Sequence, residues 1–420
     1  MYITVLSGVK GDTRRYRSFH LYEQLRLAGL ECRLSHLTDP RLPWFLQNSG
    51  LAIFHRTALD PYVERLVLRV KSAGGVVLHD VDDLIFDPAA FSWIDSPDFQ
   101  DPVRAGLYRE EMDRHRAALL ASDGVLASTG FLAEQVRTLG KPVFVHRNAF
   151  SLEMMALAEQ ALWNRPSTPG RVVIGYASGT PTHDRDFELA APALKEVLRR
   201  YPHTELHLVG PLDPGAGWDE FGGRVQRLPL VPWRRLPQIL AGFDINLAPL
   251  EGRNPFGQSK SEIKFMEAGL VQVPTIASPT DAFAHAIRSG ENGLLAGSPA
   301  EWLEHLTCLV EQPGLRQSLG GRARQDVLAG YHPGHRAAGL LDALETIYIR
   351  LDKGSFRAAF PPGTPMEPPP VPSEVEAGPS LSAMAAYTLR HRGPVTLLKQ
   401  VWVYIRRALA PVFPYRRREF

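Results

Sequence analysis

Two lysines and a glutamate stand at helical spacing within residues 249–278. Lys260, Lys264 and Glu267 are four and three residues apart, which predicts that they share one face at the start of a helix. A helix N-terminus with two lysines suits a diphosphate. A carboxylate on the same face can accept hydrogen bonds from both hydroxyls of a ribose. The alternative is a solvated Lys/Glu helix face, which is the commoner explanation of such a cluster in isolation.

Acidic residues follow an apolar run that ends at Leu78. His79 and Asp80 come directly after it, and Asp82 and Asp83 follow. Asp80-Val-Asp82 is an Asp-x-Asp pair, whose hard oxygen ligands suit a divalent cation on a diphosphate. We favour the alternative, in which Asp82 or Asp83 caps the next turn and the three aspartates lie on the acceptor side of a site without a metal.

A glycine-containing turn follows the first apolar run. Gly8 and Gly11 belong to Ser7-Gly-Val-Lys-Gly-Asp-Thr13, which is neither the Gly-x-Gly-x-x-Gly fingerprint nor a Walker loop. This argues against a dinucleotide dehydrogenase and a P-loop ATPase. Glycine lets a ligand approach the backbone, and the alternative is a plain strand-to-helix turn.

Short apolar runs alternate with helical patterns twice along the chain. Strands are predicted in the first half at 2–6, 32–34, 51–54, 76–78, 124–127 and 142–145. After a Pro/Ser/Gly cluster at 165–170 they are predicted at 172–176, 205–209, 225–227, 244–247 and 275–277. Such alternation predicts mostly parallel sheets with helices on both faces, an α/β protein with two Rossmann-like doubly wound domains.

The same pattern gives the domain boundaries. We expect an N-terminal Rossmann-like domain at 1–165 and a C-terminal one at 171–352, then an extended Pro-rich linker at 353–386 and a basic amphipathic tail at 387–420. Two such open sheets bind ligands in the cleft between the carboxyl ends of their strands. The first domain would then carry the acceptor side and the second the nucleotide sugar.

Composition excludes several classes of protein. Of 420 residues, 44% are hydrophobic, which is ordinary for a folded protein. The 47 Lys and Arg nearly balance the 45 Asp and Glu. From Tyr387 onward, however, eight basic residues accompany one acid, Glu419, so an acidic body carries a basic tail. This distribution argues against nucleic-acid binding and favours an enzyme with an added contact to an anionic surface.

The sequence predicts neither a signal peptide nor a membrane-spanning helix. The two cysteines, Cys32 and Cys308, are too far apart for a zinc motif and give no disulfide framework. The apolar run at Tyr2 is too short for a signal peptide, and the sequence holds no stretch of about 20 apolar residues. We therefore expect a cytoplasmic protein, with peripheral binding at the inner face of the membrane as an option.

Several segments together resemble the retaining family 4 glycosyltransferases of the B fold (glycosyl transferases group 1). They are Lys264-x-x-Glu267-Ala with Val273-Pro-Thr-Ile-Ala-Ser278, Gly290-Glu-Asn-Gly-Leu-Leu295, Ala127-Ser-Thr129 with Phe131-Leu132, Asn148, Ile174-Gly-Tyr-Ala-Ser-Gly-Thr180, Leu208-Val-Gly210 and Phe243-Asp-Ile-Asn-Leu-Ala-Pro-Leu250. The resemblance covers about residues 1–350. It implies a nucleotide-sugar site between two lobes.

The resemblance also assigns roles to residues. Glu267 matches the second glutamate of the family's Glu-x7-Glu motif, which holds the ribose. The first falls on Ser259, a departure for which Glu262 or Lys264 would substitute at the sugar. In the loop that opens the second domain, Arg185 is the expected phosphate cation and His183 the second, beside Gly179. His79 matches a histidine that approaches the donor sugar.

The function implied is transfer of a sugar, as a hexosyltransferase-type enzyme, from a nucleoside diphosphate sugar to an acceptor hydroxyl. The resemblance implies retention of configuration and synthesis of a cell-surface polysaccharide or glycolipid. No cofactor is expected, and Lys264, His79 and Arg185 would form the catalytic group. Two alternatives stay open: a sugar-nucleotide epimerase of the same fold, and an inactive homologue that binds a sugar nucleotide, to which Ser259 points.

The tail is predicted to be an interfacial helix. Apolar residues fill Pro394–Pro411, with Lys399, Arg406 and Arg407 between them, a pattern typical of a helix lying on anionic lipid. Lipid binding would make a lipid-linked acceptor plausible. The alternatives are docking onto the enzyme body and binding of a partner protein.

Overall fold

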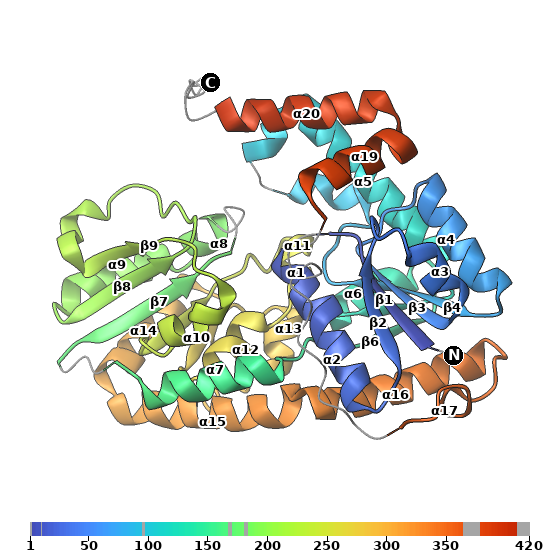
Figure 1. The fold of residues 1–420 in the computed structure, drawn as a ribbon. Coiled ribbons are helices and arrows are strands. Elements are labelled where there is room, and N and C mark those ends of the chain that lie inside the picture. Colours follow the sequence, from blue (N-terminus) through green and yellow to red (C-terminus); the bar gives the residue numbers. More distant parts are fainter. Residues whose placement is uncertain are drawn as a thin grey trace.

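The computed structural model describes residues 2–9, 11–94, 97–166, 170–179, 184–363 and 379–409. Two lobes stand side by side, each built around a parallel six-stranded sheet (Figure 1). The expected α/β architecture of two doubly wound units is confirmed. His183, residues 364–378 of the expected Pro-rich linker and the end of the tail lie outside the described residues.

The first sheet has the strand order β2-β1-β3-β4-β5-β6. Its strands are β1 Tyr2–Ser7, β2 Cys32–His36, β3 Ser49–His55, β4 Val76–Val81, β5 Gly124–Ala127 and β6 Val143–Val145. Every residue of β1, β3 and β4 is buried, as in a sheet covered on both faces. Since β4 continues to Val81, it places His79 and Asp80 inside the strand.

Helices cover both faces of this sheet. They are α1 Asp12–Arg14, the π-helix η1 Arg15–Phe19, α2 His20–Leu27, α3 Leu42–Gln47, α4 Pro61–Ser72, α5 Pro102–Ala121 and α6 Gly130–Arg137, with 3-10 turns η2 Pro88–Trp93 and η3 Pro97–Gln100. Asp60 caps α4 by accepting hydrogen bonds from the amides of Tyr62 and Val63. The long helix α5 was not among the predicted elements, because its buried residues alternate with charged ones and give no clear apolar stripe.

The second sheet has the order β12-β11-β10-β7-β8-β9. Its strands are β7 Val172–Ala177, β8 Thr204–Val209, β9 Val225–Leu228, β10 Ile245–Ala248, β11 Thr275–Ala277 and β12 Leu294–Leu295. Its helices are α8 Asp184–Glu188, α9 Ala191–Arg200, α10 Leu236–Leu240, α11 Pro255–Ser259, α12 Ile263–Leu270, α13 Asp281–Ala286, α14 Pro299–Glu311 and α15 Pro313–Tyr331, with 3-10 turns η5 Asp219–Arg224 and η6 Trp233–Arg235.

Two helices cross between the lobes. α7 (Leu152–Trp163) leads into the second lobe, and α16 (Pro333–Arg350) returns from it and lies along the first (Figure 1). Leu340 and Leu344 of α16 pack in one core cluster with Ile3 of β1. The chain after residue 332, which we expected in the second domain, therefore completes the core of the first.

The C-terminal part forms a helical hairpin on the first lobe. After α17 (Phe356–Ala359), whose Phe356 is buried against the first lobe, the described chain resumes with α19 (Leu381–Arg392) and α20 (Pro394–Leu409). α19 and α20 pack on each other and lie above α5 (Figure 1). We call this pair the C-terminal hairpin.

Candidate functional site

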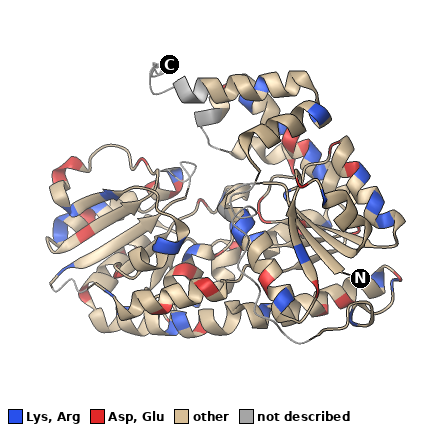
Figure 2. Ribbon diagram, in the orientation of Figure 1, with Lys and Arg blue, Asp and Glu red and all other residues tan. Residues whose placement is uncertain are grey.

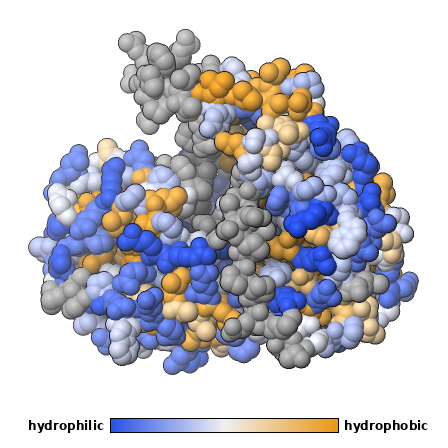
Figure 3. Space-filling view, in the orientation of Figure 1, coloured by the Kyte–Doolittle hydropathy of each residue, from blue (hydrophilic) through white to orange (hydrophobic). Residues whose placement is uncertain are grey.

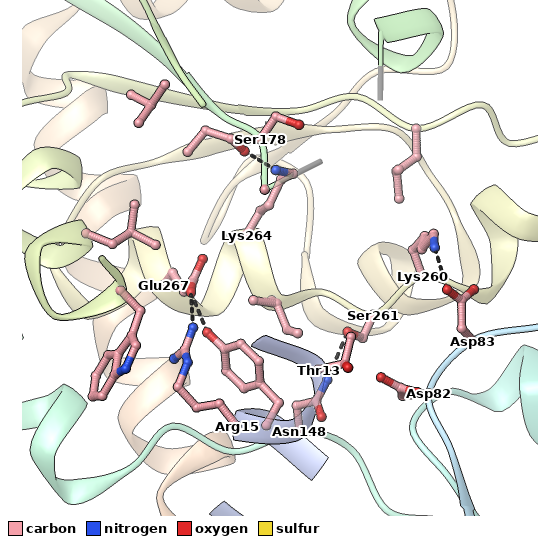
Figure 4. Close-up of a pocket in the computed structure, with 18 of the residues that line it drawn as sticks. Thr13, Arg15, Asp82, Asp83, Asn148, Ser178, Lys260, Ser261, Lys264 and Glu267 are labelled. Atoms are coloured by element: carbon pink, nitrogen blue, oxygen red, sulfur yellow. Dashed lines mark hydrogen bonds and ion pairs between the residues drawn. The ribbon is translucent and has the colours of Figure 1, made fainter. Parts of the chain in front are cut away.

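A cavity of about 290 Å³ lies between the lobes (Figure 4). The first lobe lines it with Thr13, Arg15, Tyr16, Arg56, Asp82, Asp83 and Asn148. The second lobe lines it with Ala177, Ser178, Gly179, Val209, Leu230, Val231, Trp233, Leu236, Leu250, Lys260, Ser261, Ile263, Lys264, Glu267 and Phe283. The cavity thus lies where the loops after β1 and β7 face the start of α12, as expected for two facing α/β sheets.

Lys264 lies in the first turn of α12 and points toward the end of β7. Its ammonium donates a hydrogen bond to the carbonyl of Ala177 and lies 4.8 Å from the ring centroid of Tyr176. Burial lowers the pKa of Lys264 from its ordinary value, and the carboxylates of Glu267 and Asp186 oppose this shift. Contacts with the Ala177 carbonyl and the Tyr176 ring therefore fix the lysine ammonium beside Ser178 and Gly179.

Glu267 lies one turn further along α12 and faces the first lobe. Its carboxylate accepts a hydrogen bond from the Tyr16 hydroxyl and is 3.9 Å from Nη2 of Arg15 (Figure 4). The Arg15 guanidinium in turn stacks on the rings of Tyr16 and Trp233, 4.3 and 4.7 Å from their centroids. The carboxylate therefore joins the two lobes at the floor of the cavity.

Lys260 departs from the predicted helix face. α11 ends at Ser259 and α12 begins at Ile263, so Lys260 lies in extended backbone between them, with φ −68° and ψ 139°. Its ammonium is 2.8 Å from Oδ2 of Asp83, across the cavity. Only Lys264 and Glu267 share the face of one helix, because the chain breaks helical geometry after Ser259.

The aspartates after β4 have separate partners. Asp80 is fully buried, and Arg17 donates to both of its oxygens at 2.9 and 2.6 Å. Asp82 accepts from Nε of Arg56 at 2.5 Å. Burial raises the pKa of Asp83, but Lys260 and Arg56 hold it below its ordinary value overall. Asp80 thus lies in the interior, while Asp82 and Asp83 line the cavity.

Two carboxylates of an Asp-x-Asp metal site would converge on one ion, whereas Asp80 and Asp82 are bound by different arginines. Among the described residues, no group of three or more His, Cys, Asp or Glu side chains is arranged to hold a metal ion.

Glu262 and Ser259 lie beside the cavity without lining it. Glu262 is buried, accepts a hydrogen bond of 2.8 Å from the Tyr331 hydroxyl and is 3.6 Å from Arg147. The hydroxyl of Ser259 is 3.1 Å from Oδ1 of Asp83 and 2.8 Å from the carbonyl of Phe256. Glu262, predicted as a sugar contact, therefore contacts the C-terminal end of α15 instead.

The remaining predicted residues lie around the cavity. His79 is 2% exposed within β4 and outside the cavity lining. Arg185 is exposed on α8 and lines a smaller neighbouring cavity of about 150 Å³. Gly8 passes so close to Arg56 that a Cβ would be 2.3 Å from its carbonyl oxygen. Gly11, with φ +94°, forms the turn before α1.

Sequence reasoning missed the residues that the first lobe contributes to the floor. Arg15 and Tyr16 belong to the π-helix η1, and π-helical turns are frequent at functional sites. Asn148 was noted in the resemblance, and its amide donates to Ser261 across the cavity at 2.9 Å. Arg56 has a positive φ of 43°, and an arginine in the sequence gives no indication of this backbone conformation.

Residues 185–342 match the family described as glycosyl transferase-like. No curated protein matches the chain.

Three solved structures share most of the architecture. Sucrose-phosphate synthase from Thermosynechococcus elongatus has 16% identity and a TM-score of 0.58, over 83% of this chain and 100% of that one. The glycosyltransferase of Rickettsia africae has 13% identity and a TM-score of 0.55, over 82% and 98%. HepE of Anabaena, in complex with UDP-glucose, has 13% identity and a TM-score of 0.54, over 82% and 100%.

At these identities the likeness concerns the fold, and retaining family 4 in particular is not distinguished. With two facing parallel six-stranded sheets and a second lobe that matches a glycosyl transferase-like family, the chain has the glycosyltransferase B fold.

Proposed function

We propose that the chain is a glycosyltransferase that moves a sugar from a nucleoside diphosphate sugar to an acceptor hydroxyl. The observation that carries the proposal is the pairing of Lys264 and Glu267, one turn apart on α12, toward a single interlobe cavity. HepE, which has the same fold, is described in complexes with UDP and with UDP-glucose, which supports a donor of this class.

Each part of the donor has a partner in the proposal. Glu267 lines the cavity and holds the ribose, since a carboxylate can accept hydrogen bonds from both ribose hydroxyls. When the donor binds, the Lys264 ammonium leaves the Ala177 carbonyl and donates its hydrogen bond to the diphosphate instead. The backbone of Gly179 borders the cavity where no Cβ blocks an approaching phosphate. Arg185 lies at the neighbouring cavity and is the second cation that we propose for the donor.

The chemical step needs charge stabilisation more than a nucleophile. As the bond between the sugar and the diphosphate breaks, negative charge grows on the leaving phosphate, and a fixed ammonium stabilises it. We propose retention of configuration and a reaction without a metal ion, with the leaving phosphate taking the acceptor proton. The interior position of His79 and Asp80 argues against direct contact with substrate, so this mechanism uses neither.

Thermal-shift and calorimetric titrations of the full chain with UDP, GDP and ADP test donor binding. A ligand at 100 times its dissociation constant should stabilise the protein by about 2.7 kcal/mol. Failure of all three nucleotides, and of UDP-glucose, to bind would overturn the proposal. Binding of a donor without hydrolysis or transfer across acceptor panels would favour the inactive homologue instead.

Two further measurements address the finer claims. Activity that survives EDTA supports the reaction without a metal ion, and activity restored only by Mg²⁺ or Mn²⁺ contradicts it. The anomeric proton coupling in the NMR spectrum of the product distinguishes retention from inversion. Release of an epimerised sugar in the absence of acceptor would assign the chain to the epimerases.

A further inference from the structure

The C-terminal hairpin carries a large apolar face that points away from the protein. On α20 the spacing of Val395, Leu398, Trp402 and Ile405 is three, four and three residues, so they lie on one face of the helix. Their exposed fractions are 64, 68, 40 and 50%. Figure 3 shows hydrophobic side chains gathered over this part of the molecule. We call these four residues the outer face of α20.

The opposite face of α20 is the more polar one, although it is turned toward the protein. Thr396, Gln400 and Val403 line a cavity of about 360 Å³ between the hairpin and α5. The Thr388 hydroxyl donates to Gln400 at 3.2 Å, and Arg104 of α5 donates to the carbonyl of Val403 at 3.3 Å. A helix on a soluble domain normally packs its apolar face inward. This arrangement is the reverse, and it exposes a contiguous patch of the kind that marks an interaction site.

Specific contacts hold the hairpin in this orientation. The Tyr387 hydroxyl donates to Oδ2 of Asp60 at 2.6 Å, and Nη1 of Arg392 is 2.9 Å from Oε2 of Glu111. The rings of Tyr62 and His391 stack with centroids 4.5 Å apart. Because these contacts come from α19, they fix the hairpin to the first lobe and leave the outer face of α20 uncovered.

The composition of the hairpin favours a lipid surface as the occupant. Trp402 and Tyr404 are aromatic residues of the type enriched where a bilayer meets water. The hairpin carries basic residues (Figure 2), of which Arg390 on α19 and Lys399 on α20 are exposed, and the sequence from 387 to 420 holds eight basic residues against one acid. Among the described residues, no helix is both long enough and apolar enough to cross a bilayer.

We propose that the outer face of α20 binds the surface of an anionic bilayer. An apolar face inserted at the headgroup boundary and flanked by cations is the usual design of an interfacial helix. A protein partner would also cover an apolar patch, but it would not require the excess of basic residues in the sequence from 387 to 420.

This docking would also bring the cleft to acceptors held in the bilayer, a consequence that rests on the proposed function. Tyr108 of α5 lines both the cavity beneath the hairpin and the smaller cavity between the lobes. The smaller cavity in turn shares Asp83 and Lys260 with the interlobe cavity. Three cavities with shared lining residues thus lie in sequence from the underside of the hairpin to the proposed donor site.

Vesicle flotation of the full chain tests the docking. The protein should float with vesicles of phosphatidylglycerol and phosphatidylcholine, about tenfold less with phosphatidylcholine alone, and less at high salt. In the double variant Leu398→Glu/Trp402→Glu, the fraction of protein bound to the anionic vesicles should fall at least about tenfold. Trp163→Glu, at a tryptophan that is 91% exposed on α7, is the matched control and should float like the parent.

Three results would overturn the proposal. The first is absence of flotation by the parent protein, and the second is equal flotation by the double variant. The third is a parent protein that is dimeric in light scattering and does not bind vesicles, together with a double variant that is monomeric. UDP binding is measured on the same preparations. Binding of GDP, ADP and UDP-glucose is measured there too. Flotation without binding of any of these four nucleotides would refute the proposed function and leave the docking intact, whereas binding of one of them without flotation would do the reverse.

Discussion

The two walls of the interlobe cavity carry similar charged residues in different states. On the first lobe, Asp80, Asp82 and Asp83 are each bound to a cation of the same protein, and Asp80 is wholly enclosed. On the second lobe, Lys264 and Glu267 line the cavity, and their contacts include a backbone carbonyl, a phenol and an arginine at 3.9 Å. The first wall therefore includes a carboxylate that is enclosed with its arginine, whereas the second wall has a cation and a carboxylate at the cavity lining.

This difference shows that charged residue types do not by themselves identify a binding site. A buried carboxylate needs a partner because leaving it unpaired costs several kcal/mol. The aspartates after β4 met that need inside the protein. The predictions below test whether the first wall is structural and the second functional.

The largest expected effect is on the stability of the first wall. Arg17→Met would leave Asp80 buried without its partner and should lower the free energy of unfolding by about 3–5 kcal/mol, as seen in the midpoint of urea unfolding. Arg200→Met, at an arginine whose side chain is 60% exposed, should change it by less than about 0.5 kcal/mol. Equal midpoints for the two variants would contradict the structural role of the first wall.

Lys264→Ala tests the second wall through turnover. Removing a cation that stabilises the leaving phosphate should lower kcat by about 10²–10³-fold, with a smaller change in the dissociation constant of the nucleotide. Lys353→Ala, far from the cleft with its ammonium 3.2 Å from the Gly74 carbonyl, is the control. A loss confined to donor affinity would mean that Lys264 binds substrate and transition state equally.

The pH dependence of stability tests the interior of β4, the strand that leads into the first wall. Burial, reinforced by His55, lowers the pKa of His79 to about 3, whereas it is about 6.5 in the unfolded chain. Between these values the unfolded chain binds the extra proton. The folded state should therefore lose about 1.4 kcal/mol per pH unit from this site as pH falls below 6.5.

His79→Phe should remove this part of the acid sensitivity, measured as the change in unfolding free energy between pH 7 and 5. His335→Phe, at an exposed histidine on α16, should leave the acid sensitivity at the parent value. Retention of the full pH slope in His79→Phe would show that His79 is accessible to protons in the folded state.

The smallest effect is expected at Glu267. Glu267→Gln keeps one acceptor oxygen and should weaken nucleotide binding by about tenfold, or about 1.4 kcal/mol, in calorimetry. Glu134→Gln, at a side chain that is 68% exposed, serves as the control. An unchanged dissociation constant would show that Glu267 does not bind the ribose, and it would contradict the binding role of the second wall.

Much of the fold followed from local sequence patterns. The predicted strands at 2–6, 51–54, 124–127 and 172–176 each fall within an observed strand, because short, mostly apolar runs form the strands of a sheet that is covered on both faces. The pair Lys264 and Glu267 could also be predicted, since residues three apart in a helix share a face whatever surrounds it. The helix α5 was harder to predict, because its buried residues give no clear apolar stripe. The apolar spacing of Leu340, Leu344 and Ile347 in α16 is typical of a helix, but only packing decided that this helix covers the first lobe.

The sequence alone determined the two alternating α/β units and the position of one cation and one carboxylate at the start of α12. Tertiary structure alone decided which partner each charge meets, because the Tyr16 hydroxyl contacts Glu267 across 251 residues and Lys260 contacts Asp83 across 177. It also decided that α20 turns its apolar side outward. Contacts between residues so far apart in the chain exist only after the lobes have packed, so no local pattern encodes them.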